Sequence, residues 1–304
     1  MPALDHRRAV ALMIVVTLLW SSAGVVTRHL DAARGFETTF WRSAFNALAL
    51  VALLSWWRGP GVLWRTLAGA GRALWISGLC WCAMFTAFMV ALTMTTVANV
   101  LITMATAPLL TALMARIALG HRVAPRTWAA IAAAGVGIGW MFGQQAAGGD
   151  ARHLLGTLVA AAVPLAAAVN WTLLQHLKGR DTDGAQGDDM LVAVLLGALL
   201  SCAITLPLAL PLQATVHDVT LLGLLGVFQL AVPCLLAVVV ARVLPAPEIS
   251  LLALLEVVFG VLWAWLGAGE APSASVLGGG LLVLGALVAN ELARLRPGPG
   301  RAEG

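Results

Sequence analysis

Apolar residues run along the chain in stretches of about 20 residues, separated by short breaks rich in charge, glycine and proline. A bilayer core about 30 Å thick takes about 20 helical residues to cross, so each stretch has the length of a transmembrane helix. Ten helices are predicted, over residues 9–29, 37–57, 73–94, 97–118, 126–143, 153–176, 190–211, 218–242, 247–267 and 275–294. We therefore expect an all-α membrane protein.

The breaks between these stretches carry residues that end helices. RGPG at 58–61 and GRDTDGAQGDD at 179–189 combine glycine with charged residues. The break at Thr95 and Thr96 is free of charge, and it is placed because one helix over 73–118 would be about twice the length that a bilayer needs.

Composition excludes several classes of protein. Hydrophobic residues make up 61% of the 304 residues and charged residues 11%, and the mean hydropathy is +0.92, which is unlike a soluble domain. The net charge of +4 is scattered at the ends of apolar stretches, so nucleic-acid binding is not expected. The four cysteines lack metal-site spacing, and no P-loop or HExxH motif is present, so we expect no metal, no cofactor and no enzyme activity.

Basic residues predict the orientation of the helices. With a cytoplasmic N-terminus, fourteen of the 18 Lys and Arg residues fall on the cytoplasmic side, and Arg28, Arg34, Arg42 and Arg152 fall outside. The positive-inside rule then places both termini in the cytoplasm. We expect Arg42, at the outer end of its helix, to snorkel to lipid head groups; the alternative is a gate or a helix anchor.

The two halves of the chain resemble each other. APLLTALMARIALGH at 107–121 aligns with EVVFGVLWAWLGAGE at 256–270, and each stretch leads through a proline into a glycine-rich last helix. Because five is an odd number, the second copy enters the membrane in the opposite orientation. The prediction is two inverted five-helix repeats, residues 1–148 and 149–304, an architecture typical of transporters.

A ridge of small residues marks the last helix of each half. Gly135, Gly139 and Gly143 form a repeated GxxxG pattern, and Gly285 and Ala289 have the same spacing. Such ridges let helices approach closely. We expect them to serve internal packing; a dimer face is the alternative.

Four motifs, in order along nearly the whole chain, carry a resemblance to a known family. They are LLWSSAGVV at 18–26, FWRSAFNALAL at 40–50, ALTMTTVANVLITMATAPLLTALMA at 91–115 and LLEVVFGVLWAWLGAGEAPS at 254–273. Together they resemble the EamA-type transporters of the drug/metabolite transporter superfamily, and most of all its YddG-like amino acid exporters. Two positions depart from the pattern: His121 stands where the second half has Glu270, and Val257 replaces a proline common in the family.

The resemblance implies a secondary transporter in the plasma (bacterial inner) membrane, a monomer or homodimer. It implies export of small metabolites, amino acids including aromatic or other neutral ones, by alternating access around a midplane cavity. No ATPase motif is present, so a gradient must drive transport. One alternative is a drug or nucleotide-sugar exchanger, which would need a basic cavity; another is a non-transporting membrane enzyme or receptor.

Glu256 is the sharpest site candidate, because it is the one acidic residue near the middle of a predicted helix. A carboxyl group in a low-dielectric environment favours its protonated form, so it could carry a proton or meet a substrate ammonium. The alternative is a glutamate that bridges two helices.

Predicted helix four carries a polar face. Asn99, Thr103 and Thr106 fall on one side of the helix, and Pro108 removes a backbone donor, so an unpaired carbonyl there could line a cavity. The alternative is that the hydroxyl groups bond back to their own helix.

The remaining candidates are aromatic, polar or helix-breaking residues within the apolar stretches, for which ordinary packing is the alternative. They are Trp20, Ser21, Ser22, Met84, Phe85, Phe88, Asn170, Trp171, Gln229 and Pro233. Pro164 and Pro233 are expected to interrupt their helices.

Overall fold

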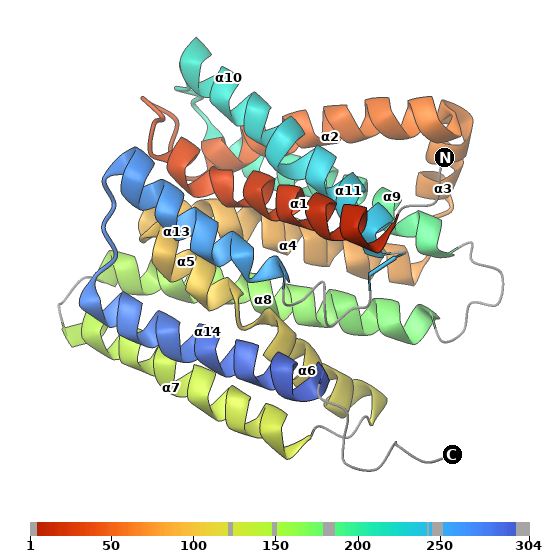
Figure 1. The fold of residues 1–304 in the computed structure, drawn as a ribbon. Helices are drawn as coiled ribbons and strands as arrows, with labels where there is room; N and C mark the ends of the chain where they lie inside the picture. Colours follow the sequence, from red (N-terminus) through yellow and green to blue (C-terminus); the bar gives the residue numbers. More distant parts are fainter. Residues whose placement is uncertain are drawn as a thin grey trace, which may run out of the picture.

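The computed structural model describes residues 5–120, 124–147, 151–178, 186–241, 243–244 and 252–295. Over these ranges the protein is helical, without a strand, and most helices lie along one common direction (Figure 1). The first half of the chain forms α1 (His6–Thr27), α2 (Phe36–Arg58), α3 (Pro60–Ala68), α4 (Arg72–Met94), α5 (Val97–Met104), α6 (Ala107–Leu119) and α7 (Pro125–Ala147). The second half forms α8 (Ala151–Lys178), α9 (Gln186–Ala209), α10 (Val216–Leu224), the π-helix η1 (Leu225–Ala231), α11 (Val232–Ala241), α13 (Leu255–Ala268) and α14 (Ala274–Leu295).

Six helical segments of the described chain are long and apolar enough to cross a membrane. They are His6–Thr27, Arg72–Met94, Val97–Ala118, Ala151–Leu173, Val192–Ala209 and Val216–Ala237. A seventh is added if α2 and α3, bent by 118°, count as one span. The protein is therefore an integral membrane protein, whereas the predicted number of ten is not reached by this criterion. Part of the predicted helix 247–267 lies outside the described residues.

The break predicted at Thr95 and Thr96 is confirmed, because α4 ends and α5 begins on either side of it. The Thr96 hydroxyl accepts a hydrogen bond from the Asn99 amide at 3.3 Å and so caps α5. Predicted helix four is itself interrupted, between α5 and α6. Pro108 stands in the first turn of α6, where its missing N–H costs no helical hydrogen bond.

Helix α3 is not predicted by the sequence pattern. Only RGPG at 58–61 marks the region as a break, yet Pro60 opens a short helix there. Nine residues are too few to span a bilayer. Leu63 anchors α3 because it is 1% exposed and packs in a cluster with Leu54 and Leu195.

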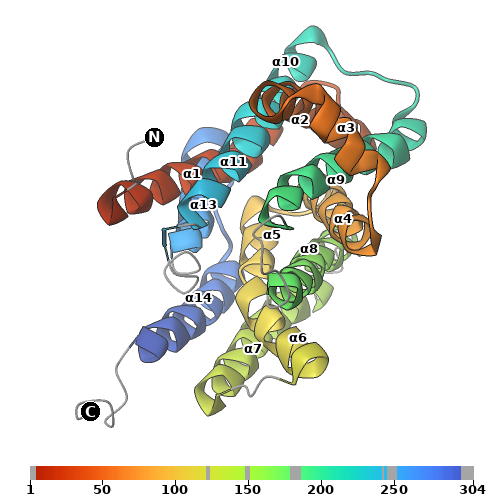
Figure 2. The same cartoon turned by 90° about the vertical axis from the view of Figure 1, so that its right-hand side faces the viewer.

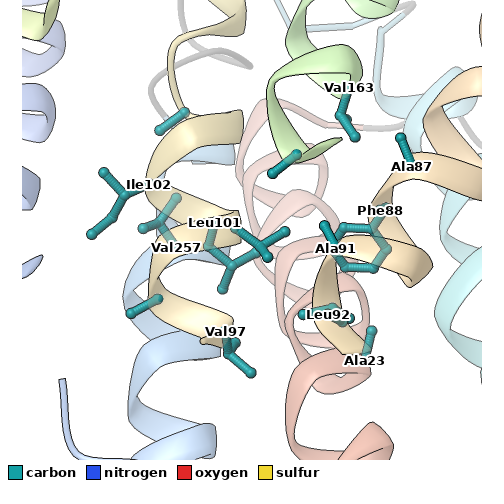
Figure 3. Close-up of a cluster of buried hydrophobic side chains, with 14 of the residues drawn as sticks. Ala23, Ala87, Phe88, Ala91, Leu92, Val97, Leu101, Ile102, Val163 and Val257 are labelled. Atoms are coloured by element: carbon teal, nitrogen blue, oxygen red, sulfur yellow. The ribbon is translucent and has the colours of Figure 1, made fainter. Parts of the chain in front are cut away.

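The core lies where the short helix α5 meets helices of both halves. Figure 3 shows side chains of α1, α4, α5, α8 and α13 around it, and Figure 2 shows the same helices from the side. Helix α5 contacts α4, α8, α13 and α14, while α4 packs along α8 and α9, and α1 along α11 and α13. The labelled side chains in Figure 3 include Ala23, Phe88, Leu101, Val163 and Val257.

Helices α7 and α14 pack together, but not through the predicted ridge. No atom of another segment comes within 4 Å of a Cβ built on Gly135, Gly139, Gly143 or Gly285. The prediction that these ridges serve internal packing is therefore wrong. The contact uses Gly137, whose Cβ would lie 2.7 Å from the Gly279 carbonyl oxygen. Residues two apart point to different sides of a helix, so the ridge faces away from α14.

Two buried carboxylates tie α2 and α10 together at the end of the bundle that carries Arg28, which we call the Arg28 end. Asp218 in α10 accepts hydrogen bonds from the backbone amides of residues 31, 32 and 33 at 2.7, 3.0 and 2.9 Å. Glu37 in α2 accepts from the amides of residues 213 and 214, both at 2.8 Å. Each carboxylate thus holds the loop that leads into the other helix.

We predict opposite effects of alanine at two helical glycines. A Cβ at Gly197 in α9 would meet the Trp81 side chain and lie 3.0 Å from the Cys82 amide nitrogen, whereas Gly135 faces open space. Gly197→Ala should lower the free energy of unfolding by about 1–3 kcal/mol, the usual cost of overpacking. Gly135→Ala should leave it unchanged or raise it by up to about 1 kcal/mol through helix propensity. Thermal unfolding of the detergent-solubilised variants measures both, and equal effects would contradict the α4–α9 packing.

Candidate functional site

The largest fully buried side chain described in the structure is Arg42, in the second turn of α2, at 1% exposure. Its Nη1 donates to the Gln229 Oε1 at 3.1 Å, and its Nη2 donates to the Phe85 carbonyl oxygen at 3.1 Å. The ring centres of Phe85 and Phe88 lie 5.9 and 5.4 Å from the guanidinium carbon, within range of cation–π attraction. The prediction that Arg42 snorkels to head groups is therefore wrong, because α4 and η1 supply partners inside the bundle.

Gln229 connects this arginine to α1. Its Nε2 donates to the Trp20 carbonyl oxygen at 3.2 Å, so α1, α2, α4 and η1 meet around Arg42. The helix is π-helical over Gln229, and Pro233 in α11 cannot donate to the carbonyl four residues before it. The predicted interruption at Pro233 is thus present as a π segment.

A glycine allows η1 to lie directly on α2. A Cβ on Gly226 would lie 2.6 Å from the Arg42 carbonyl oxygen and 2.8 Å from the Asn46 amide nitrogen. No other residue fits between these backbones without moving them. The approach brings Gln229 within hydrogen-bond reach of Arg42.

Glu256 is related to this group through Cys234. The Cys234 thiol, 6% exposed, interacts with the Trp20 indole and is within electrostatic range of both Arg42 and Glu256. Glu256 itself is half-buried in the first turn of α13. The structure therefore brings Trp20, Gln229 and Glu256 around one region, together with Arg42. We call Arg42, Gln229, Trp20, Cys234 and Glu256 the Arg42 cluster.

The polar face predicted on helix four takes no part in the hydrogen bonds described for the Arg42 cluster. Thr103 donates to the Asn99 carbonyl oxygen and Thr106 to the Thr103 carbonyl oxygen, both at 2.7 Å. Ser21 and Ser22 behave alike, donating to carbonyl oxygens three residues earlier in α1 at 2.8 and 2.7 Å. These hydroxyl groups bond back to their own helices. The Asn99 Oδ1 is buried and has no hydrogen-bond partner in the described chain.

The other candidates belong to the contact between α4 and α8. Asn170 is buried and accepts a hydrogen bond from the Ser77 hydroxyl at 2.6 Å. Trp171 is 44% exposed, with its ring edge-on to Trp81 at 6.4 Å, and Met84 is buried in the core. The break expected at Pro164 is absent, because α8 continues through it.

Sequence reasoning missed a hydroxyl cluster beside Arg42. The hydroxyl oxygens of Ser43 and Thr86 each lie 3.0 Å from that of Ser201, so the cluster joins α2, α4 and α9. Each residue is unremarkable in its own stretch, and only the packing of three helices brings them together.

Asp31, His217 and Asp218 also place possible metal-ligand atoms within 4.8 Å of one another. Asp218 is already occupied by backbone amides, so we assign no metal there.

A basic cavity opens at the Arg28 end. It has a volume of about 220 Å³ and lies between the ends of α1, α2, α4 and α8. A second cavity of about 380 Å³ shares Arg28, Thr93 and Arg152 with it. Three arginines line the first cavity: Arg28, Arg34 and Arg152. The rest of its lining is Thr27, Leu30, Ala33, Thr38 and Thr93.

Glu270 fixes one wall of this cavity. Its Oε2 accepts a hydrogen bond from the Arg28 Nε at 2.6 Å, and its Oε1 accepts from the Val97 amide at 2.6 Å, so α1, α5 and α13 are joined. Arg28 also donates to the carbonyl oxygens of Leu92 and Thr95. Gly269 directs the chain there with a left-handed φ of 67°.

The matching glycine of the first half has the same conformation. Gly120 ends α6 with a φ of 69°, and its amide donates to the carbonyl oxygen four residues earlier, as the amide of Gly269 does at the end of α13. This agrees with the predicted alignment of 107–121 with 256–270. His121, the counterpart of Glu270, lies outside the described residues.

Long apolar helices that hold a buried arginine, hydroxyl groups and a half-buried carboxyl between them define a polytopic membrane protein with an internal polar region. Residues 7–143 match the model of the EamA-like transporter family. The first half of the chain is therefore similar to that family.

Solved structures share the fold. One, described only as "Crystal structure of protein", superposes with a TM-score of 0.61 over 95% of this chain and 99% of that chain, at 20% identity. No curated protein matches the chain.

We predict that Glu270→Ala lowers the free energy of unfolding by about 2 kcal/mol, between the values of exposed and buried ion pairs. Arg28 and Glu270 are 25% and 18% exposed, and the variant leaves both Arg28 and the Val97 amide without this partner. Glu270→Gln keeps an acceptor for the Val97 amide, so it should lower the free energy of unfolding by about half as much. Asp31→Ala, whose side chain is 59% exposed, is the control. Unfolding in detergent measures all three, and equal losses for Asp31→Ala and Glu270→Ala would refute the link.

Proposed function

We propose that the protein is a secondary transporter that exports small metabolites, most simply amino acids, by alternating access. The match of residues 7–143 to the model of the EamA-like transporter family supports the transporter class. The observation that carries the proposal is the Arg42 cluster, where helices of both halves meet at buried polar groups. Thr38, on the wall of the basic cavity, is one helical turn from Arg42 in α2.

The proposed architecture is ten membrane helices in two inverted halves, residues 1–148 and 149–304, with both termini in the cytoplasm. The matching conformations of Gly120 and Gly269 support equivalent helix ends, and the packing of α7 on α14 pairs the last helix of each half. On this topology the Arg28 end faces outward. We propose a plasma (bacterial inner) membrane location and a monomer or homodimer. The absence of ATPase motifs from the sequence implies a gradient as driving force.

An exchanger of anionic metabolites is the second candidate. The scarcity of Lys and Arg within the predicted helices argues against it, but Arg28, Arg34 and Arg152 around the cavity and the buried Arg42 favour it. The two candidates differ in one respect: an exchanger needs a substrate on both sides, whereas a coupled exporter does not.

We predict that the purified protein in liposomes moves labelled neutral amino acids from a broad panel of small metabolites. If the protein is a proton-coupled exporter, an imposed proton gradient should drive net flux of the labelled compound with no substrate on the opposite side of the membrane. An exchanger gives flux only when unlabelled substrate is present on the opposite side. Absence of flux for every member of the panel, in both formats, would contradict the transporter proposal.

We predict that Glu256→Gln abolishes the pH dependence of transport while the variant still folds. Glu256 is half-buried and within electrostatic range of Cys234, so protonation of Glu256 changes the charge within the Arg42 cluster. Asp31→Asn, at an exposed carboxylate of the Arg28 end, is the matched control and should keep the pH profile of the unchanged protein. Flux measured from about pH 5 to 8 tests this; an unaltered profile in Glu256→Gln would remove Glu256 from proton coupling.

A further inference from the structure

Arg42 is a buried cation that forms no ion pair with any residue the structure describes. Its partners, the Gln229 amide oxygen and the Phe85 carbonyl oxygen, are neutral, and its Nε has no hydrogen-bond partner in the described chain. None of the carboxylates in the described residues forms an ion pair with it. We propose that Arg42 recognises a carboxylate of the transported molecule, with Asn46 as a second polar contact. The inference rests on the proposed transport function and names the chemical group at its site.

The physical argument begins with the charge. A guanidinium stays protonated in proteins, and removing it from water is costly unless an opposite charge and hydrogen bonds replace the water. The Phe85 and Phe88 rings offset part of this cost by cation–π attraction. A carboxylate supplies the missing charge and accepts two parallel N–H bonds, which is the geometry that arginine favours.

Asn46 provides an independent observation. It lies one turn from Arg42 on the same side of α2, it is fully buried, and both its Oδ1 and its Nδ2 are without partners in the described chain. Buried amide groups are nearly always hydrogen-bonded, so two unsatisfied residues in adjacent turns indicate groups that a ligand can use. The Asn46 Oδ1 can accept from the ammonium of an amino acid while Arg42 holds its carboxylate.

The cavity at the Arg28 end reaches α2 one helical turn from Arg42. Thr38, one turn from Arg42 in the other direction, lines the cavity that Arg28, Arg34 and Arg152 surround. A carboxylate that leaves Arg42 toward this end would meet a second basic region. The π-helical turns of η1, which carry Gln229, lie between Arg42 and α1, and π-helical turns are frequent at functional sites.

The competing interpretation is that Arg42 only ties α1, α2 and α4 together. Gln229→Glu separates the two. The change is nearly isosteric and places a carboxylate 3.1 Å from the Arg42 Nη1, so it strengthens the contact between η1 and α2 and supplies the counter-charge from within the protein. The hydrogen bond from the Gln229 Nε2 to the Trp20 carbonyl oxygen is lost in exchange. A structural tie predicts a stable variant with unchanged selectivity. Carboxylate recognition predicts a stable variant that no longer prefers carboxylates.

The experiment measures counterflow in proteoliposomes with paired probes: phenylalanine against phenethylamine, and leucine against isopentylamine. The unchanged protein should prefer each acid over its decarboxylated partner by roughly tenfold or more, the loss expected for a charge-assisted hydrogen bond. Gln229→Glu and Arg42→Gln should bring the ratio to about one, and Arg42→Lys should retain part of the preference. Gln144→Glu, the same change at an exposed position of α7, should leave the ratio unchanged.

The other possible outcomes distinguish carboxylate recognition by Arg42 from transport itself. Equal flux of acids and amines in the unchanged protein, or an acid preference that persists in Gln229→Glu, overturns the recognition proposal while transport stands. If no probe moves, thermal unfolding with each probe decides: stabilisation by the acids that Gln229→Glu abolishes supports recognition without transport. Absence of both flux and stabilisation overturns recognition and transport together.

Discussion

The structure depends on one constraint: a polar group inside an apolar helix bundle must find its partner within the protein. Arg42 shows the constraint at its strongest, because the charge lies between α1, α2, α4 and η1 and its two hydrogen-bond acceptors among the described residues are neutral. Two local features of the helices allow this arrangement. Gly226 lets η1 rest on the α2 backbone, and the π-helical turns carry Gln229, which bonds both to Arg42 and to the Trp20 carbonyl oxygen. The same rule explains the carboxylates of Glu37 and Asp218 at the Arg28 end, each of which accepts hydrogen bonds from backbone amides of a neighbouring loop.

Much of the fold could be predicted from the sequence, because apolar length is a one-dimensional property. The helical class, the membrane character and the break at Thr95 and Thr96 follow from the spacing of apolar residues, and the glycine turns that end α6 and α13 follow from the alignment of the two halves. Helix α3 and the division of predicted helix four into α5 and α6 could not be predicted. Both depend on packing, as the burial of Leu63 illustrates. The glycine ridge failed for the same reason: spacing identifies a smooth face and does not say what lies against it.

The site could be predicted only in part. Trp20, Gln229 and Glu256 were selected as polar or aromatic residues within apolar stretches, and they lie around one region of the structure. Arg42 was placed at a lipid interface because it lies near a helix end, whereas neighbouring helices leave its side chain only 1% exposed. Sequence position gives depth along one helix, but burial depends on its neighbours. The threonines of predicted helix four satisfy their hydroxyl groups locally, a possibility that spacing alone leaves open.

Alternating access around the Arg42 cluster requires the cavity at the Arg28 end to open and close. The most direct measurement is the distance between spin labels placed at Arg34 and Arg152, which line that cavity from the α1–α2 loop and from α8, in a variant whose four native cysteines are serine. Pulsed electron resonance on the protein in liposomes should give two distances, and a transported compound should shift their proportions. A single distance that no transported compound changes would contradict the account.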